Sequence, residues 1–228
     1  MDELYPIFLR LNAKPVLVVG GGAVALRKAE GLLAAGALVT VVSMDFHAGF
    51  ASLPAVQRIT AAYEPAHLVG AEALRWVLVF AATNNRQVNA RIYSDSNALG
   101  ILCCRCDMPH DGDFIGPAVK RCGPVTLAVG SAGASPGLAG ELARQLAQSM
   151  DTAILRQIQL SARWRQHAME RIPDGELRRN LLRRISSKLM RDTIEQAGDA
   201  EAEKLFQQWL TESMNAATVA GHATEPRV

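Results

Sequence analysis

Apolar residues in the first half of the chain fall into short runs that are separated by segments of helix length. The first clear run, Val16–Val19, leads directly into three glycines. The alanine-rich segment after them has apolar residues at helical spacing and ends at Gly36, which predicts a helix from Ala23 to about Ala35. Leu38–Val42 is a second run rich in β-branched residues, so the pattern predicts strand, helix and strand.

The same alternation continues to residue 104. Trp76–Ala82 is almost continuously apolar, as expected of a parallel strand that is buried on both faces. Gln87–Ala98 has a helical pattern, and Ile101–Cys104 is the next expected strand. Strands that alternate with helices predict an α/β fold, here a Rossmann-type doubly wound parallel sheet. Shorter elements are expected in between: a helix over Phe46–Leu53, a strand over Val56–Thr60 and a helical turn after Glu64.

The second half of the chain has a different pattern. Two further strand candidates, Phe114–Lys120 and Val125–Val129, follow the predicted sheet. Beyond them the pattern is helical to about Leu210, with interruptions at Ile172–Gly175 and near Gly198. A sheet domain, a short middle region and a helical domain are therefore predicted.

The glycines after the first strand have the spacing G-x-G-x-x-A. Gly20 permits the tight turn from strand to helix, Gly22 lets the backbone approach a pyrophosphate, and Ala25 lets the helix pack close to the strand. The N-terminus of that helix offers unpaired N–H groups to phosphates. Because a strand precedes the motif and a helix and a second strand follow it, the sequence predicts a dinucleotide site.

Further cofactor contacts are expected at the carboxyl edge of the sheet, where ligands bind in open α/β folds. Asp45 lies 25 residues after Gly20, where an acid commonly binds the ribose hydroxyls; capping of the next helical turn is an equal alternative. No arginine follows Asp45 directly, which favours NAD over NADP. The candidate cofactor-binding residues are Gly20, Gly22, Ala23, Val24, Ser43, Met44, Asp45 and Thr83.

Composition and charge argue against several classes of protein. Apolar residues make up 49% and charged residues 20% of the chain, as in a soluble globular protein, and the net charge of +2 does not indicate general nucleic-acid binding. No apolar run is long enough to span a membrane and the first residues are acidic, so a cytoplasmic protein without a secretory signal is expected. The polar residues from Thr218 to Val228 are expected to form a disordered tail.

The four cysteines are Cys103, Cys104, Cys106 and Cys122. Three of them, together with His110, could in principle hold a metal ion. Their spacing differs from a C-x-x-C zinc motif, however, and adjacent residues of a strand face opposite sides of the sheet. Small buried thiols at the end of a strand are therefore the preferred interpretation, and no metal site is predicted.

Basic residues are concentrated in the predicted helical domain. Two interpretations are open: a solvated helical surface, which composition alone favours, or a surface for a polyanionic ligand. The basic residues are Arg156, Arg163, Arg165, Arg171, Arg178, Arg179, Arg183, Arg184, Lys188 and Arg191.

Several stretches occur together and in a fixed order. They are Tyr5–Leu9, Val18–Ala29, Phe80–Asn84, Val88–Asn89, Asp107–Pro109, Phe114–Ala118 and Gly130–Pro136. In this order they resemble the precorrin-2 dehydrogenase/sirohydrochlorin ferrochelatase family, the N-terminal type of siroheme synthase without its methyltransferase domain. The resemblance is detailed over roughly residues 1–150 and general over the helical remainder.

The resemblance implies an NAD-binding Rossmann domain over residues 1–113, a dimerisation region over 114–150 and a helical domain over 151–228. These would form a homodimer with the active-site cleft between the domains, and neither nucleic acid nor a membrane is expected as a partner. The implied reaction is NAD-dependent oxidation of precorrin-2 to sirohydrochlorin. In bifunctional members ferrous iron, a substrate of the second step, is then inserted to give siroheme. The many carboxylates of precorrin-2 would match an arginine-rich surface.

Asp107 matches the catalytic aspartate of the family. It follows a strand at the ligand edge, where its carboxylate would accept a proton as hydride leaves for the nicotinamide, or would accept pyrrole protons as a metal enters the macrocycle. Capping of a turn is the alternative role. No metal ligand is fixed by the sequence, and contact of the iron with Asp107 would be transient. Ser131 matches a serine for which substrate contact or regulation is implied, with a turn hydroxyl as the alternative.

The chain departs from the family pattern close to Asp107. Cys104 replaces an asparagine, Arg105 replaces a valine, and Gly140 replaces an arginine after the Ser-Pro pair. These departures concern metal insertion more than oxidation, so a dehydrogenase without chelatase activity is one alternative. An NAD-sensing regulatory module, which would need no aspartate at residue 107, and an unrelated NAD oxidoreductase, which would show a His, Tyr or Lys acid–base group, are the others.

Overall fold

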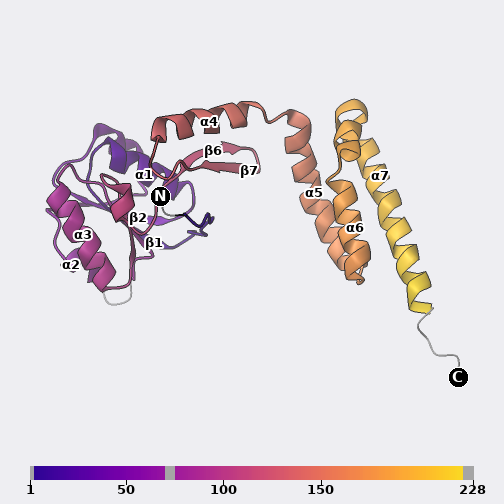
Figure 1. Ribbon diagram of the computed structural model, residues 1–228, viewed down its shortest axis with the longest axis horizontal. Helices are drawn as coiled ribbons and strands as arrows, with labels where there is room; N and C mark the ends of the chain where they lie inside the picture. The colour runs from indigo at the N-terminus through magenta and orange to yellow at the C-terminus, as the bar shows by residue number, and fades with distance from the viewer. Residues whose placement is uncertain (1–2, 70–74, 223–228) are drawn as a thin grey trace, which may run out of the picture. The chain divides into compact units, whose positions relative to one another are not determined.

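The computed structural model describes residues 3–69 and 75–222 (Figure 1). The contacts divide the chain into two compact units. The first, here called the sheet unit, contains Met1–Pro117 and Gly130–Ala139. The second, here called the helical unit, contains Ala118–Val129 and Gly140–Val228.

The sheet unit is built on five parallel strands in the order β3-β2-β1-β4-β5. This is the order of a Rossmann-type sheet, with the topological switch between β1 and β4, so the predicted fold class is confirmed. The strands are β1 (Pro15–Val19), β2 (Leu38–Ser43), β3 (Gln57–Thr60), β4 (Leu78–Ala81) and β5 (Leu102–Arg105). The helices and 3₁₀ turns of this part are α1 (Ala23–Leu33), η1 (Ala48–Ser52), α2 (Ala66–Val69), α3 (Arg86–Ala98) and η2 (Pro109–Asp111).

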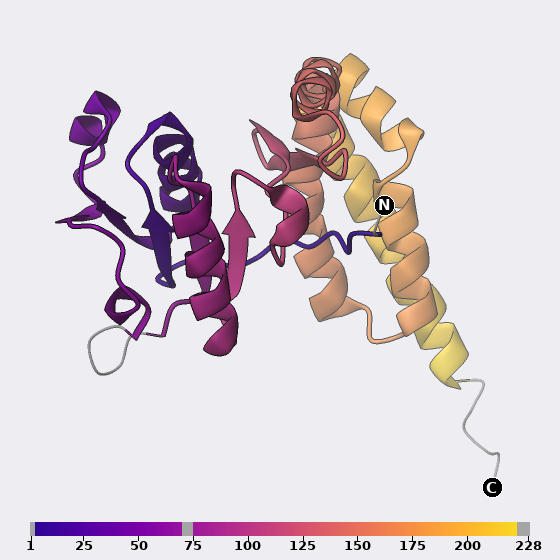
Figure 2. The same cartoon turned by 60° about the vertical axis from the view of Figure 1, so that its left-hand side comes forward.

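Strand β1 shows why the apolar runs are continuous. Val16 and Val18 pack into one buried cluster with residues of α1, whereas Leu17 and Val19 pack into a second cluster with Ile92 of α3. Each face of the sheet is therefore covered by a helix, and a central strand has no solvent-facing side. Figure 2 shows α3 alongside the strands.

The predicted elements are present with shifted ends. A 3₁₀ turn over Ala48–Ser52 takes the place of the short helix expected over Phe46–Leu53. The strand expected from Phe114 begins only at Ala118, because the preceding residues form an irregular segment after η2. Helix ends and short strands depend on contacts that a sequence pattern does not contain.

The helical unit contains a two-stranded antiparallel hairpin and a group of helices. The hairpin pairs β6 (Ala118–Cys122) with β7 (Val125–Val129). Three helices share one apolar core in which Trp164 stacks on Phe206, with ring centroids 5.2 Å apart. The helices of this part are α5 (Thr152–Arg171), α6 (Gly175–Ile185) and α7 (Lys188–His222), together with α4 (Pro136–Gln148), whose first turn belongs to the sheet unit.

The interruptions in the helical pattern have clear local causes. Asp174 caps α6 by accepting hydrogen bonds from the backbone N–H groups of Glu176 and Leu177. Gly198 has φ +80°, a conformation that favours glycine, and divides α7 into two helical parts. The helix continues to His222, so the disordered tail expected from Thr218 is wrong for residues 218–222, and residues 223–228 lie outside the described chain.

Among residues 3–69 and 75–222, no helix combines the length and the apolar character needed to cross a membrane.

Candidate active site

The sheet unit has a pocket of about 730 Å³ at the carboxyl ends of β1, β2 and β4. It is lined by residues 19–24, 42–47, 61–63, 82–85 and Val88. The structure thus brings all eight candidate cofactor-binding residues into one cavity at the switch point of the sheet, where open α/β folds bind their ligands. Neither Asp107 nor Ser131 lines this pocket.

Two of the three glycines in the loop after β1 are required by the fold itself. Gly20 has φ +121°, and a Cβ added there would lie 2.3 Å from the carbonyl oxygen of Ala82. A Cβ on Gly21 would lie 1.9 Å from the carbonyl oxygen of Asp45. Sequence reasoning missed Gly21, which the G-x-G-x-x-A spacing treats as a free position although the loop end of β2 packs directly against it.

Gly22 is different, because a Cβ there would meet nothing within 4 Å. It is the N-cap residue of α1, with no side-chain cap and no acidic residue in the first turn. The N–H groups at this helix end therefore point to an open, positively polarised site. The protein gives no steric reason for glycine here, which fits a backbone that must lie against a bound pyrophosphate.

Asp45 follows β2 with an exposed side chain at the pocket. The alternative in which it caps the next helical turn is wrong. His47 is the N-cap residue of η1, and its Nδ1 accepts a hydrogen bond of 3.0 Å from the backbone N–H of Gly49. The Asp45 carboxylate is left beside the pocket, where binding of ribose hydroxyls stays a prediction.

A buried amide organises the loop after β4. Asn89 is fully buried, and its Oδ1 accepts hydrogen bonds from the backbone N–H of Thr83 at 3.1 Å and from the Thr83 hydroxyl at 2.7 Å. Its Nδ2 donates to the Thr83 carbonyl at 3.1 Å. Asn85 caps α3 by accepting from the N–H groups of Gln87 and Val88. Thr83 is thereby held at the pocket wall by α3.

Asp107 lies just beyond β5, and the Asn89 amide lies near enough to help lower the pKa of its carboxyl. Its main partner is Arg105, whose Nη2 lies 2.9 Å from Oδ2 and whose Nε lies 3.4 Å from Oδ1. Burial on its own raises the pKa of the Asp107 carboxyl. The hydrogen bonds from Arg105, from the backbone N–H of Asp107 and from Asn89, with the Arg105 charge, outweigh burial and lower that pKa below its ordinary value.

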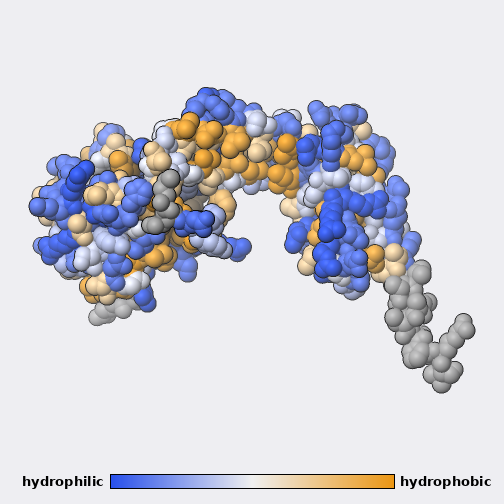
Figure 3. Space-filling view, viewed as in Figure 1, coloured by the Kyte–Doolittle hydropathy of each residue, from blue (hydrophilic) through white to orange (hydrophobic). Residues whose placement is uncertain are grey.

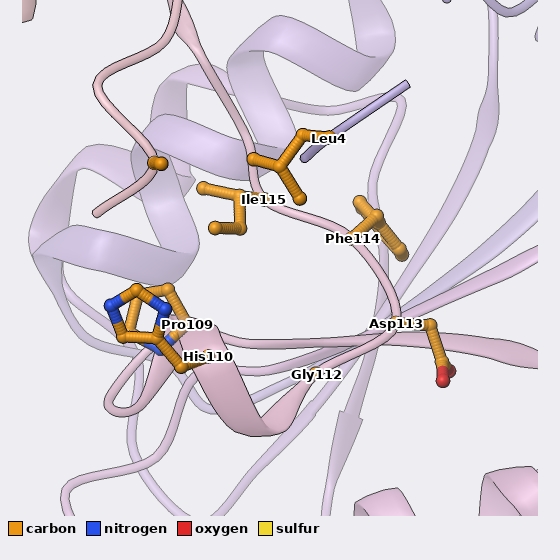
Figure 4. Close-up of a pocket in the computed structure, with 8 residues that line it drawn as sticks. Leu4, Pro109, His110, Gly112, Asp113, Phe114 and Ile115 are labelled. Atoms are coloured by element: carbon orange, nitrogen blue, oxygen red, sulfur yellow. The ribbon is translucent and has the colours of Figure 1, made fainter. Parts of the chain in front are cut away.

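Ser131 lies in a turn of the sheet unit. Its hydroxyl accepts a hydrogen bond of 3.1 Å from the backbone N–H of Ser135, and its carbonyl accepts one of 2.9 Å from Ala134. This is the turn-hydroxyl arrangement. Its neighbour Ala132 lines a much smaller pocket of about 70 Å³, together with Leu4, Pro109, His110, Gly112, Asp113, Phe114 and Ile115 (Figure 4).

The cysteines near Asp107 are divided between the two faces of the sheet. Cys104 is buried with the α1 cluster and Cys103 with the α3 cluster, as expected of small buried thiols on adjacent strand positions. Burial raises the pKa of Cys103 to about 12. A hydrogen bond with Cys106 lowers the pKa of Cys104 and raises that of Cys106. The described residues contain no group of three or more potential metal ligands.

Several basic residues of the helical unit hold helices together. Arg156 pairs with Asp199, Arg163 with Glu203 at 2.8 Å, and Arg184 with Glu212 at 2.8 Å, each joining α5 or α6 to α7. Lys188 pairs with Asp192 within α7, Arg178 donates to the carbonyls of Ile172 and Pro173, and Arg191 donates to Gln157. Of these ten basic residues, four have no ion-pair or hydrogen-bond partner within the described part of the chain: Arg165, Arg171, Arg179 and Arg183.

Pocket, glycine loop and strand order together define a dinucleotide-binding α/β protein. Residues 7–118 match the family model described as "Putative NAD(P)-binding". Over 219 residues the chain is 36% identical to "Siroheme synthase 2" of Aeromonas salmonicida, and over 149 residues 45% identical to "Siroheme synthase 1" of the same organism. It is 32% identical over 221 residues to "Siroheme synthase" of Tolumonas auensis. The chain is thus a relative of the siroheme synthases, and the resemblance found in its sequence is confirmed.

These relatives are longer proteins. The matched segments cover 95%, 64% and 97% of this chain but 44%, 31% and 46% of the respective synthases, so the chain spans less than half of their length. A solved structure titled "SirC, precorrin-2 dehydrogenase" has the same fold, with a TM-score of 0.68 at 24% identity. That match covers 90% of this chain and all of the other.

Proposed function

We propose that the chain catalyses the NAD-dependent oxidation of precorrin-2 to sirohydrochlorin. The observation that carries the proposal is the connection of the two halves of the site. Asn89 hydrogen-bonds Thr83 at the wall of the dinucleotide pocket, and the same amide lies near enough to Asp107 to help lower the pKa of its carboxyl. Similarity to siroheme synthases, and a fold shared with a precorrin-2 dehydrogenase, support this substrate.

The residues present fit a dinucleotide. Open space at Gly22 and the uncapped start of α1 would receive the pyrophosphate, and Asp45 would bind the adenosine ribose. Bound NAD supplies the hydride acceptor. The substrate loses two hydrogens, one as hydride to NAD and one as a proton to a base. Asp107 is the carboxylate placed to accept that proton.

Exposed arginines of the helical unit support the proposal that the substrate is acidic. Arg165, Arg171, Arg179 and Arg183 are exposed and unpaired among the described residues, so they can bind carboxylates without breaking an internal ion pair. This makes the polyanion-binding interpretation of the basic helices specific to these four side chains.

A second activity, insertion of ferrous iron into sirohydrochlorin, is proposed on the same carboxylate. Asp107 is held as an anion and could accept pyrrole protons as iron, a substrate of this step, enters. We also propose the domain division at residues 113 and 150 and a homodimer formed through 114–150. Exposed Leu138, Leu142 and Leu146 of α4 support such contacts, and Figure 3 shows apolar surface along this helix. A cytoplasmic location stays a prediction.

The decisive experiment supplies freshly made precorrin-2 and NAD to the purified chain and follows NADH and the sirohydrochlorin absorbance, with and without ferrous iron. We expect NADH formation in both cases and the siroheme spectrum only with iron. Binding of NAD without turnover would instead favour the regulatory module. Turnover without iron uptake would leave a dehydrogenase alone.

Two variants locate the reaction. Gly22→Val should remain folded and lose NAD affinity at least about tenfold, because its side chain enters space left for the pyrophosphate. Gly31→Val is the matched control, since Gly31 of α1 is also open on all sides but lies outside the pocket. Asp107→Ala should keep NAD affinity and lose oxidation; an unchanged rate would remove Asp107 from the mechanism.

A further inference from the structure

Arg105 is a buried cation next to the proposed base. It is the last residue of β5, its side chain is only 7% exposed, and it pairs through the strand register with Ala81 of β4. Asp107 lies in the bend that follows β5, and its carboxylate meets the Arg105 guanidinium there. An arginine buried to this degree needs carboxylate partners.

The guanidinium binds two carboxylates in a fixed geometry. Nε and Nη2 lie against the two oxygens of Asp107, and Nη1 lies 3.0 Å from Oδ2 of Asp111 in η2. Asp111 is about half exposed, with 47% of its side chain accessible, whereas Asp107 is 16% exposed. The planar fork therefore determines the orientation of the less exposed carboxylate and links it to the following turn.

We propose that Arg105 is a positioning residue for the oxidation of precorrin-2: its buried guanidinium fixes the orientation of the Asp107 carboxylate and keeps it ionised. The proposal rests on the proposed function. The groups that face Asp107 are Arg105 on β5, the uncharged Asn89 amide on α3 and, through the shared guanidinium, Asp111 on η2. Without Arg105, two carboxylates that now share one cation would repel each other.

The arrangement has a chemical consequence for the proton transfer. Each carboxylate oxygen has two lone pairs, so Asp107 can bind the guanidinium and still accept one proton from the substrate. Ion pairing keeps the carboxylate available at acidic pH, where an unpaired aspartate beside another carboxylate would be protonated. Arg105 thus acts through Asp107 and does not itself exchange a proton.

The test compares the pH dependence of kcat/KM for oxidation in the wild type, Arg105→Leu and Arg105→Lys. The wild type should show no fall caused by Asp107 between about pH 8 and 5. Arg105→Leu should lower kcat at least about tenfold and bring an acidic limb into that range. Arg105→Lys restores the charge without the fork, so it should regain the wild-type pH profile, without the acidic limb, and only part of kcat. Arg58→Leu, at an exposed arginine of β3, is the matched control.

Asp111→Asn in the Arg105→Leu background sharpens the result, because removal of the second carboxylate should move the acidic limb back towards lower pH. A carboxyl-carbon NMR titration of Asp107 follows the pairing without turnover, and its pKa should rise in Arg105→Leu. An unchanged titration, or a pH profile that superimposes on the wild type, overturns the proposal. If Arg105→Leu does not fold, the Lys variant decides the question: a kcat in Arg105→Lys equal to that of the wild type overturns the proposal. If the wild type does not oxidise precorrin-2, the proposed function fails and the titration alone decides the pairing.

Discussion

The two units use the same pair of groups, arginine and carboxylate, in different ways. In the sheet unit Arg105 is buried and binds Asp107 and Asp111, which lie two and six residues further along the chain. In the helical unit the arginines that pair between helices are exposed and meet acids 28 to 43 residues away. The buried arginine sets the chemistry of one carboxylate, whereas the exposed ones connect helices at a small gain each.

The largest loss of stability should come from Gly21→Leu. The Cβ of the new side chain would lie only 1.9 Å from the carbonyl oxygen of Asp45. Both groups belong to backbone that packs tightly, so the sheet unit should not fold and NAD binding should be lost. Far-UV circular dichroism should retain the signal of the helical unit. A stable sheet unit in this variant would contradict the packing of the glycine loop.

Trp164→Ala should remove about 3–5 kcal/mol from the stability of the helical unit, because Trp164 is fully buried against Phe206. The fluorescence of Trp209, in the same core, would report unfolding in urea. Titration calorimetry separates the two units: the affinity of Trp164→Ala for NAD should equal that of the wild type. A loss of NAD affinity in this variant would show that the two units do not act independently.

The Glu203 carboxylate lies between the buried and the exposed ion pairs in character, since it accepts hydrogen bonds from both Arg163 and the buried Trp164 indole. Burial raises the pKa of Glu203, but bonds from Gln207, Trp164 and Arg163 outweigh it, so that pKa is lowered. A lowered folded pKa stabilises the protein above the unfolded value of 4.5 and loses this contribution as pH falls through the folded pKa. Glu203→Gln should therefore cost about 1 kcal/mol at pH 7 and almost nothing near pH 3. A cost that persists in acid would exclude ionisation as its source.

Arg156→Ala should have the smallest effect on stability, smaller than that of Glu203→Gln, because both partners of the Arg156–Asp199 pair are exposed. The cost should shrink further in high salt, as urea titrations at two ionic strengths would show. A loss of stability as large as that of Trp164→Ala would mean that exposed pairs in the helical unit resemble the buried one in the sheet unit.

Periodicity predicted the sheet well, because every central strand is buried on both faces and its sequence is therefore continuously apolar. The pocket could be predicted too, since Gly20, Gly22 and the ends of β2 and β4 meet at one edge in any such sheet. The need for glycine at residue 21 could not, because it depends on how closely the Asp45 carbonyl approaches.

The ionic contacts were harder to foresee. The pairing of Arg105 with Asp107 was not predicted from the sequence, because the burial that makes this pair strong depends on the whole unit. The partners of Arg156, Arg163 and Arg184 follow from the packing of α5 and α6 on α7, which a sequence does not specify. A basic stretch that suggests one ligand surface is therefore divided between structural pairs and four arginines that have no ion-pair partner among residues 3–69 and 75–222.

The buried Asn89 amide has one further consequence. Its oxygen and nitrogen both bind Thr83, and it lies beside Asp107, whose carboxylate is held by Arg105. The pocket wall and the carboxylate are therefore both fixed by groups that folding has already ordered. Groups that are already ordered lose little conformational entropy when a ligand arrives. In the proposed reaction, the carboxylate that accepts the proton would thus be placed during folding, and substrate binding energy would remain for orienting the tetrapyrrole.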